Sequence, residues 1–197
     1  MTTTTGEAST GDGRVPPRRS RRLFALPSGI VLVVAIFLPV VKVCGDPAYP
    51  IQVPFVWGPY VLGGLVIAMA LAGTARGLRG LVITAQAIVA LQWGGFGLAM
   101  FQDVSGAPWG LLLLAAVVAF WYGTRRGDRE QGAANAVIGI GLVCLPWFAL
   151  FAFDKDGMWG AWVSLGAALA VIGSGLEWRR ELRLARTEPV PTARVVA

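Results

Sequence analysis

Residues 133–153 have the sequence AANAVIGIGLVCLPWFALFAF, an uninterrupted run without a charged side chain. In helical form a run of this length covers about 30 Å, the thickness of the hydrocarbon core of a bilayer. A helix inside a soluble domain has no need of such a long apolar stretch. The run therefore predicts a transmembrane helix, and with it an integral membrane protein.

The composition of the whole chain supports the same class. The 197 residues are 55% hydrophobic and only 14% charged, with a mean hydropathy of +0.64. Soluble domains contain about 25% charged residues, which they need to cover their surface. A chain of this length is expected to form one domain, most of it inside the membrane.

Similar apolar runs recur along the chain and predict an all-α fold, a polytopic transmembrane bundle of about six helices. Residues 1–20 lack large apolar side chains and predict a disordered basic tail, and 187–197 a flexible tail. Residues 179–186 continue the last helix with an amphipathic pattern typical of the headgroup zone. The predicted membrane domain is 21–186, and its helices cover about 23–43, 60–77, 81–101, 107–123, 133–153 and 158–178.

Basic residues indicate the orientation of this bundle. With the six helices placed as above, all fifteen arginines lie on one side, and Lys42 and Lys155 lie on the other. Basic residues near membrane ends are retained in the cytoplasm. We therefore expect both termini in the cytoplasm, and the excess of arginine, alanine and glycine favours a bacterial cytoplasmic membrane.

Two segments leave alternatives open. Ser20–Phe24 resembles a twin-arginine export signal, although no small-residue cleavage site follows it, which favours an uncleaved first helix. Residues 44–59 contain four prolines and predict a stiff extended loop, either a spacer or a surface for a partner. Cys44 at the outer rim and Cys144 near mid-membrane are expected to be too far apart for a disulfide.

Several kinds of chemistry are disfavoured by composition. The chain has no histidine, which excludes histidine-containing zinc sites and Ser–His dyads. No ionisable residue lies in the central part of a predicted helix, which argues against proton relays and ion-coupled transport. The positive charge flanks apolar runs and forms no basic face, so nucleic-acid binding is not expected. We predict no catalytic residue, metal site or cofactor.

One group of residues is a candidate lining for a cavity. Gln86, Gln92 and Trp93 are the large polar or amphipathic side chains deep in the third predicted helix. Polar side chains in lipid need hydrogen-bond partners, so both glutamines should face protein or a wet cavity. The fifth helix offers an opposing surface at Cys144, Pro146 and Trp147, because a proline frees a backbone carbonyl. Ordinary interhelical hydrogen bonds are the alternative to a cavity.

These observations favour a non-enzymatic membrane accessory, scaffold or interaction subunit. A pore or uncoupled carrier for a small neutral or apolar solute is the alternative, and a lipid-modifying enzyme is a weaker one. Expected partners are anionic lipid headgroups at the arginine-rich face, and a second copy or another membrane protein. Small residues spaced by four in the last helix, Gly166, Ala170 and Ser174, fit either packing inside the bundle or contact between copies.

Overall fold

The computed structural model describes residues 22–102 and 107–187. Within this part of the chain most residues are helical, and its strands form one two-stranded hairpin, so the predicted all-α class is confirmed. The predicted tail 1–20 lies outside the described residues, as does the predicted tail 187–197 except for Thr187, which is the last residue of α7.

Seven α-helices and several short helical turns follow one another along the described chain. The helices are α1 (Ala25–Val34), α2 (Gly58–Leu71), α3 (Ala75–Val89), α4 (Gly95–Ala99), α5 (Ala107–Arg125), α6 (Arg129–Ala152) and α7 (Trp159–Thr187). The strands are β1 (Val41–Val43) and β2 (Asp46–Ala48). A π-helical turn, Ala90–Gly94, joins α3 to α4, and 3-10 turns lie at Arg22–Phe24, Ala35–Phe37, Pro50–Gln52, Pro54–Val56 and Met100–Gln102.

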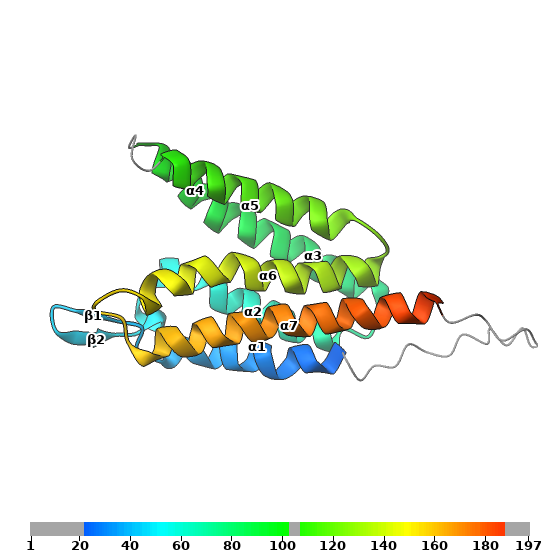
Figure 1. Cartoon of the computed structure of the whole chain (residues 1–197), viewed down its shortest axis with the longest axis horizontal. Helices are drawn as coiled ribbons and strands as arrows, with labels where there is room; N and C mark the ends of the chain where they lie inside the picture. The colour runs from blue at the N-terminus through cyan, green and yellow to red at the C-terminus, as the bar shows by residue number, and fades with distance from the viewer. Residues whose placement is uncertain (1–21, 103–106, 188–197) are drawn as a thin grey trace, which may run out of the picture.

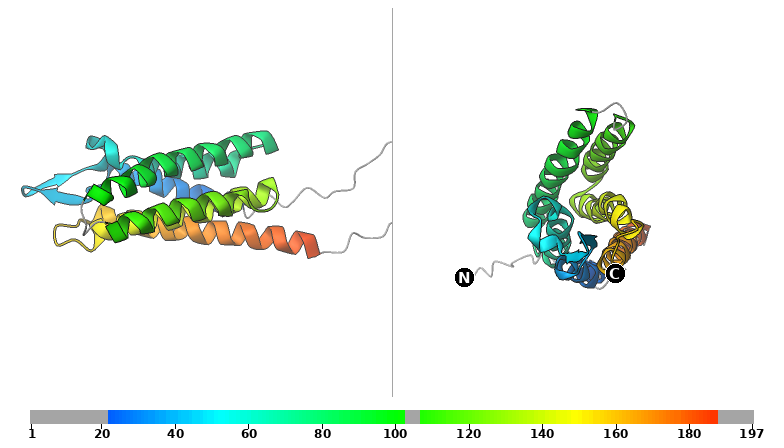
Figure 2. Two further views of the ribbon diagram at one scale, coloured as in Figure 1. Left: turned by 90° about the horizontal axis from the view of Figure 1, so that it is seen from above. Right: turned by 90° about the vertical axis from the view of Figure 1, so that its left-hand side faces the viewer.

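The helices form a body and an arm (Figure 1). In the body α1 packs against α2 and α7, and α6 packs against α7 and α3. We use the name arm for α4 and α5, which pack against each other and diverge from α6 toward one end of the molecule. The end-on view in Figure 2 shows the arm projecting to one side of the body.

Close contact between α6 and α7 depends on glycine. A Cβ at Gly141 would lie 2.5 Å from Ile172 Cγ1 and 2.8 Å from the Ala168 carbonyl oxygen. A Cβ at Gly175, on the facing helix, would lie 2.7 Å from Ile138 Cγ1. Small residues let helix backbones approach closely in lipid, where packing replaces the hydrophobic effect as the driving force.

The first helix is shorter than its predicted range, 23–43. Its helical part ends with the 3-10 turn Ala35–Phe37, and Leu38 is extended with ψ of 143°. The next residue is Pro39, whose ring disfavours helical backbone in the residue before it. The apolar run continues past Pro39, so hydropathy alone placed the end of the helix too late.

The second helix also ends early, at Leu71, and the third begins at Ala75. Thr74 caps the third helix, since its Oγ1 accepts a hydrogen bond of 3.1 Å from the Gly77 N–H. Arg76 and Arg79 therefore lie in the first turns of α3, whereas the predicted ranges 60–77 and 81–101 placed them at the end of one helix and in the connection to the next. Serine and threonine are preferred at this capping position because they satisfy a free backbone N–H.

The proline-rich segment begins as a β-hairpin, which corrects the prediction of an extended loop. Strands β1 and β2 pair through a two-residue turn in which Cys44 has φ of 54° and Gly45 has φ of 92°. Two-residue hairpin turns of this kind require positive φ at both central residues. The hairpin also pairs with the connection before α7, through a bridge between Val41 and Gly157.

Helix α6 begins before its predicted range, whereas α7 continues through the predicted extension. Asp128 caps α6, which begins at Arg129, one turn before the predicted start. Residues 179–186 continue α7 without a break, as the straight helix in Figure 1 shows.

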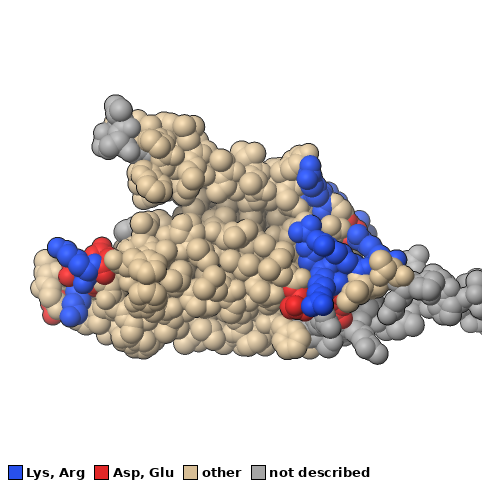
Figure 3. Space-filling view, in the orientation of Figure 1, with Lys and Arg blue, Asp and Glu red and all other residues tan. Residues whose placement is uncertain are grey.

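Charged side chains gather at the two ends of the molecule (Figure 3). We define the basic end by the arginines of the described residues, which are Arg22, Arg76, Arg79, Arg125, Arg126, Arg129, Arg179, Arg180, Arg183 and Arg186. We define the hairpin end by β1, β2 and the connection carrying Asp154, Lys155 and Asp156. In the face drawn in Figure 3, the surface between the two ends is free of charged residues.

This distribution agrees with a protein that crosses a bilayer. Four helices are long and apolar enough to span one: Ala75–Gln102, Ala107–Arg125, Arg129–Ala152 and Trp159–Thr187. The apolar helices Arg22–Phe37 and Gly58–Leu71 are shorter. Large apolar side chains such as Leu150 and Val118 are about two-thirds exposed, which suits a surface that contacts lipid.

Candidate functional site

A π-helical turn interrupts the long third predicted helix at Ala90–Gly94. This turn contains Gln92 and Trp93, two of the residues that the sequence predicted to line a cavity. A π-turn inserts an extra residue into the helical hydrogen-bond ladder and often marks a functional site. The sequence around it, Ala-Leu-Gln-Trp-Gly-Gly, has polar and aromatic side chains that suggest a site but no residue pattern that predicts the altered backbone.

Aromatic rings connect this turn to α6. Trp93 is buried and lies with its ring centroid 6.4 Å from that of Trp147, edge to face. Trp147 also meets Phe96 of the arm at 5.6 Å and Phe151 at 5.8 Å. Tilted aromatic pairs at these distances are favourable beyond their burial alone. The rings connect α6 to the π-turn and to the arm, and Trp93 and Trp147, two of the predicted cavity residues, lie against each other.

Gln86 lies in the last turn of α3, just before the π-turn, and its side chain is buried. Its Nε2 donates a hydrogen bond of 2.6 Å to the Thr124 hydroxyl at the end of α5. The Thr124 hydroxyl donates in turn to the Phe120 carbonyl, 2.9 Å away. The amide of Gln86 is therefore engaged in an interhelical hydrogen bond, which is the alternative that the sequence left open for it.

Gln92 points toward the start of α2. Its side-chain amide lies so close to Gly58 that a Cβ there would be 1.2 Å from Gln92 Oε1. Gly58 thus provides the space that the glutamine occupies. This placement turns the amide toward protein, as expected for a polar group at membrane depth.

The two remaining candidates lie apart from these contacts. Cys144 is fully buried in the hydrophobic core, whereas Pro146 is exposed on the surface of α6. α6 continues through Pro146 without ending. The structure thus brings Trp93 and Trp147 together, gives Gln86 and Gln92 separate neighbours, and leaves Pro146 on the outside. A cavity lined by all six residues stays a prediction.

Two surface hollows involve different residues. One, of about 550 Å³, lies between α1 and α7 and is lined by Pro27, Val31, Gly166 and Ala170 among others. The other, of about 470 Å³, lies where α5, α6 and α7 meet. None of the six predicted cavity residues lines either hollow. Periodicity could not identify them because each combines side chains from separate helices.

Some small residues of α7 pack inside the bundle, and others line the first hollow. Ser164 is fully buried and donates to the Gly160 carbonyl, so this part of the helix packs within the bundle. A Cβ at Gly166 would meet no atom within 4 Å, and this residue lines the first hollow.

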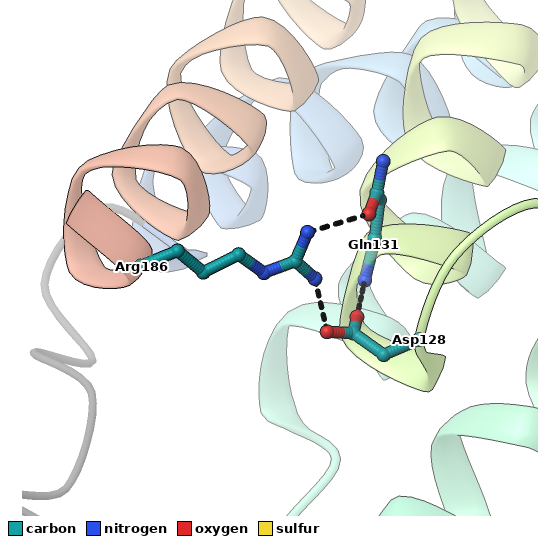
Figure 4. A network of polar contacts seen from close by, with 3 residues as sticks. All are labelled: Asp128, Gln131 and Arg186. Carbon is teal, nitrogen blue, oxygen red and sulfur yellow. Dashed lines mark hydrogen bonds and ion pairs between the residues drawn. The ribbon is translucent and has the colours of Figure 1, made fainter.

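A polar network ties α7 to α6 at the basic end (Figure 4). Asp128 Oδ1 accepts a hydrogen bond of 2.8 Å from the Gln131 N–H, and Oδ2 pairs with the Arg186 guanidinium. Arg186 also donates to Gln131 Oε1, 3.1 Å away. The Gln131 N–H, together with the Arg186 charge, lowers the pKa of Asp128. The carboxylate at this position therefore already has a basic partner.

The described residues contain no group of three or more Asp, Glu or Cys side chains that could hold a metal ion. Comparisons with protein families, with curated proteins and with solved structures gave no match to this chain.

Proposed function

We propose that this protein is a non-enzymatic, multi-pass interaction subunit of a bacterial cytoplasmic membrane. In this proposal six helices cross the bilayer, the basic end and both termini face the cytoplasm, and the hairpin end faces outward. The opposite placement of the arginines and of Lys42 and Lys155 supports the orientation, because basic residues are retained in the cytoplasm.

Two of the six proposed transmembrane helices are shorter than the hydrocarbon core of a bilayer. Arg22–Phe37 and Gly58–Leu71 would cover about 24 Å and 21 Å, less than the hydrocarbon core. Both are packed between the same two ends as the long helices. At the basic end, Arg22 donates hydrogen bonds to the Met69 and Ala72 carbonyls at the end of α2. These hydrogen bonds satisfy carbonyls at the end of the short α2, where lipid would offer no donor.

The divergent arm is the observation that carries the proposed role. Only 17% of the most apolar stretch of α5 is buried, against 44% for α6 and for α7. Leu112 and Trp109 are 58% and 65% exposed on the arm. Figure 3 shows a notch between the upper lobe, formed by the arm, and the rest of the molecule. Most of the surface of α5 is not in contact with the rest of the chain. This free surface can pack against a transmembrane helix of a partner or of a second copy.

The pore or carrier hypothesis has less support from the geometry. Gln86 is engaged with Thr124, and aromatic rings occupy the region between the π-turn and α6. A pathway for a polar solute would need free polar groups or open space there.

Site-specific photo-crosslinking in native membranes tests the proposal. A photoreactive residue at position 112 in the arm should yield adducts with another protein or with a second copy, distinguishable by mass. The matched control is position 169 on α7, since Leu169 is 54% exposed and thus nearly as accessible as Leu112. We expect protein adducts at 112 and lipid adducts at 169. Lipid adducts at both positions would contradict an interaction role for the arm.

A further inference from the structure

The hollow between α5, α6 and α7 is amphipathic along its length. At the basic end its walls carry Arg126, Gln131, Asn135 and Arg179. Farther along α5 and α6 its walls are apolar, with Ala119 and Leu142 among the lining residues. Polar atoms therefore line one end of the groove, and hydrocarbon lines the other.

The length and place of this groove match one leaflet of a bilayer. Along α6 it extends from Gln131 to Val143, which is about 18 Å at the helical rise. Half of a hydrocarbon core is about 15 Å. If the basic end lies among the headgroups, as in the proposed topology on which this step rests, the groove begins at headgroup depth and ends near the midplane. An acyl chain of a phospholipid covers the same distance.

The two arginines carry charge that the described residues do not neutralise. Neither Arg126 nor Arg179 forms an ion pair within the described part of the chain. Arg179 Nε is buried and has no hydrogen-bond partner among these residues, which is costly for a charged group without an acceptor. Asp128, an acid at the same end, is already paired with Arg186.

Arg126 is also held in place. Its guanidinium lies 4.3 Å from the centroid of the Tyr122 ring, and Nη2 donates to the Tyr122 hydroxyl at 3.1 Å. A positioned arginine binds the oxygens of a phosphate through charge-assisted hydrogen bonds. Basic pockets between transmembrane helices on the cytoplasmic side bind anionic lipid headgroups in this manner.

We propose that the groove binds one anionic phospholipid, with its phosphate at Arg126 and Arg179 and one acyl chain along the apolar walls of α5 and α6. This site goes beyond the proposed interaction role, since it lies at the base of the arm and not on its exposed outer surface. It also differs from a general attraction of the basic end for anionic membranes. The proposal assigns the binding to two of the ten described arginines and to a groove of defined length.

Native mass spectrometry of the full chain in detergent tests this site. The probes are phosphatidylglycerol and phosphatidylcholine with identical acyl chains. We expect the anionic lipid to bind at least tenfold more tightly. The double variant Arg126→Gln/Arg179→Gln should weaken its binding about 25-fold, because each arginine near a headgroup contributes about fivefold.

The control variant is Arg76→Gln/Arg79→Gln, which removes the same charge from the same end of the molecule, at exposed positions outside the groove. It should change binding less than twofold. Equal losses in the two double variants would show that binding depends on diffuse charge, and would overturn the proposal. Equal binding of the two lipids would overturn it as well.

A third variant, Ala119→Trp, tests the acyl-chain part without altering a charge. Ala119 is exposed in the groove wall, so the larger side chain fills the groove without entering the core. We expect severalfold weaker binding of phosphatidylglycerol. Unchanged binding in this variant, or displacement of the lipid by soluble glycerol phosphate, would identify a site for soluble anions or headgroups alone and would overturn the proposal.

Discussion

The α6–α7 pair and the α4–α5 arm are both built from antiparallel apolar helices with glycine at the contact, yet they differ in what they pack against. α6 and α7 are buried over 44% of their most apolar stretches, while α5 is buried over 17% of its own. The arm is tightly packed internally, since a Cβ at Gly110 would lie 2.7 Å from the Gly97 carbonyl oxygen. It diverges from the body as a unit. Hydrophobicity therefore determines that these helices enter a membrane, whereas the positions of small residues determine which helices stay together.

The largest effect should come from filling the α6–α7 contact. Gly141→Ala places a Cβ within 2.8 Å of the Ala168 carbonyl, a backbone atom that cannot move independently. We expect a loss of about 1–3 kcal/mol in the free energy of unfolding. Denaturation by sodium dodecyl sulfate, followed by circular dichroism, measures this loss.

The matched control is Gly166→Ala on α7, where a Cβ would meet nothing within 4 Å. This variant should change the free energy of unfolding by less than about 0.5 kcal/mol. Similar effects of the two substitutions would contradict the account of close packing between α6 and α7.

A smaller effect is expected at the base of the arm. Thr124→Val removes the hydroxyl that accepts a hydrogen bond from Gln86 and should cost about 1 kcal/mol. A double-mutant cycle with Gln86→Leu should give a coupling energy of about 0.6–1.7 kcal/mol. Thr84→Val is the control, because that exposed hydroxyl bonds the carbonyl of Gly80 in its own helix. Zero coupling would show that this hydrogen bond does not hold the arm to α3.

Several of these features were predictable from sequence and others were not. The six apolar segments and the segregation of basic residues follow from hydropathy and charge alone. The helix ends do not, because they depend on single residues: Pro39 ends the first helix early, and Thr74 and Asp128 begin α3 and α6 by capping. Threonine and aspartate are both residue types that commonly cap helices, because their side chains satisfy free backbone N–H groups. These two residues therefore predict the starts of α3 and α6 better than hydropathy does.

The candidate site was predictable only in part. The need for a hydrogen-bond partner correctly suggested that Gln86 and Gln92 face protein, but nothing in the sequence identified Thr124 or Gly58 as their neighbours. The groove at the basic end combines side chains from three helices, so no periodic pattern indicates it. Pro146 was predicted to face a cavity because a proline frees a backbone carbonyl, whereas its side chain lies exposed on a continuous helix.

The smallest effect concerns the end of α7 and its pH dependence. The lowered pKa of Asp128 means that its contribution to stability is present at neutral pH, and is lost as the pH falls through the folded-state pKa, below about 4. Because the group is exposed, the effect should stay below about 1 kcal/mol. A spin label at position 187 should become more mobile in that pH range.

Two substitutions separate charge from capping at this position. Asp128→Asn keeps a helix cap and should make the label mobile at neutral pH, while Asp128→Ala should also destabilise the start of α6. A pH transition that persists unchanged in Asp128→Asn would show that another group titrates.

The central claim, six spans with the basic end in the cytoplasm, is tested most directly by cysteine labelling in intact bacterial cells. A native cysteine can report on the proposed outer side, since Cys44 is exposed at the tip of the hairpin and Cys144 is buried. A membrane-impermeant maleimide should label the Cys144→Ala variant, whose remaining thiol is at Cys44. It should not label a variant with Thr187→Cys on a background of Cys44→Ala and Cys144→Ala until the cells are lysed. Labelling of position 187 in intact cells, or protection of Cys44 until lysis, would contradict this topology.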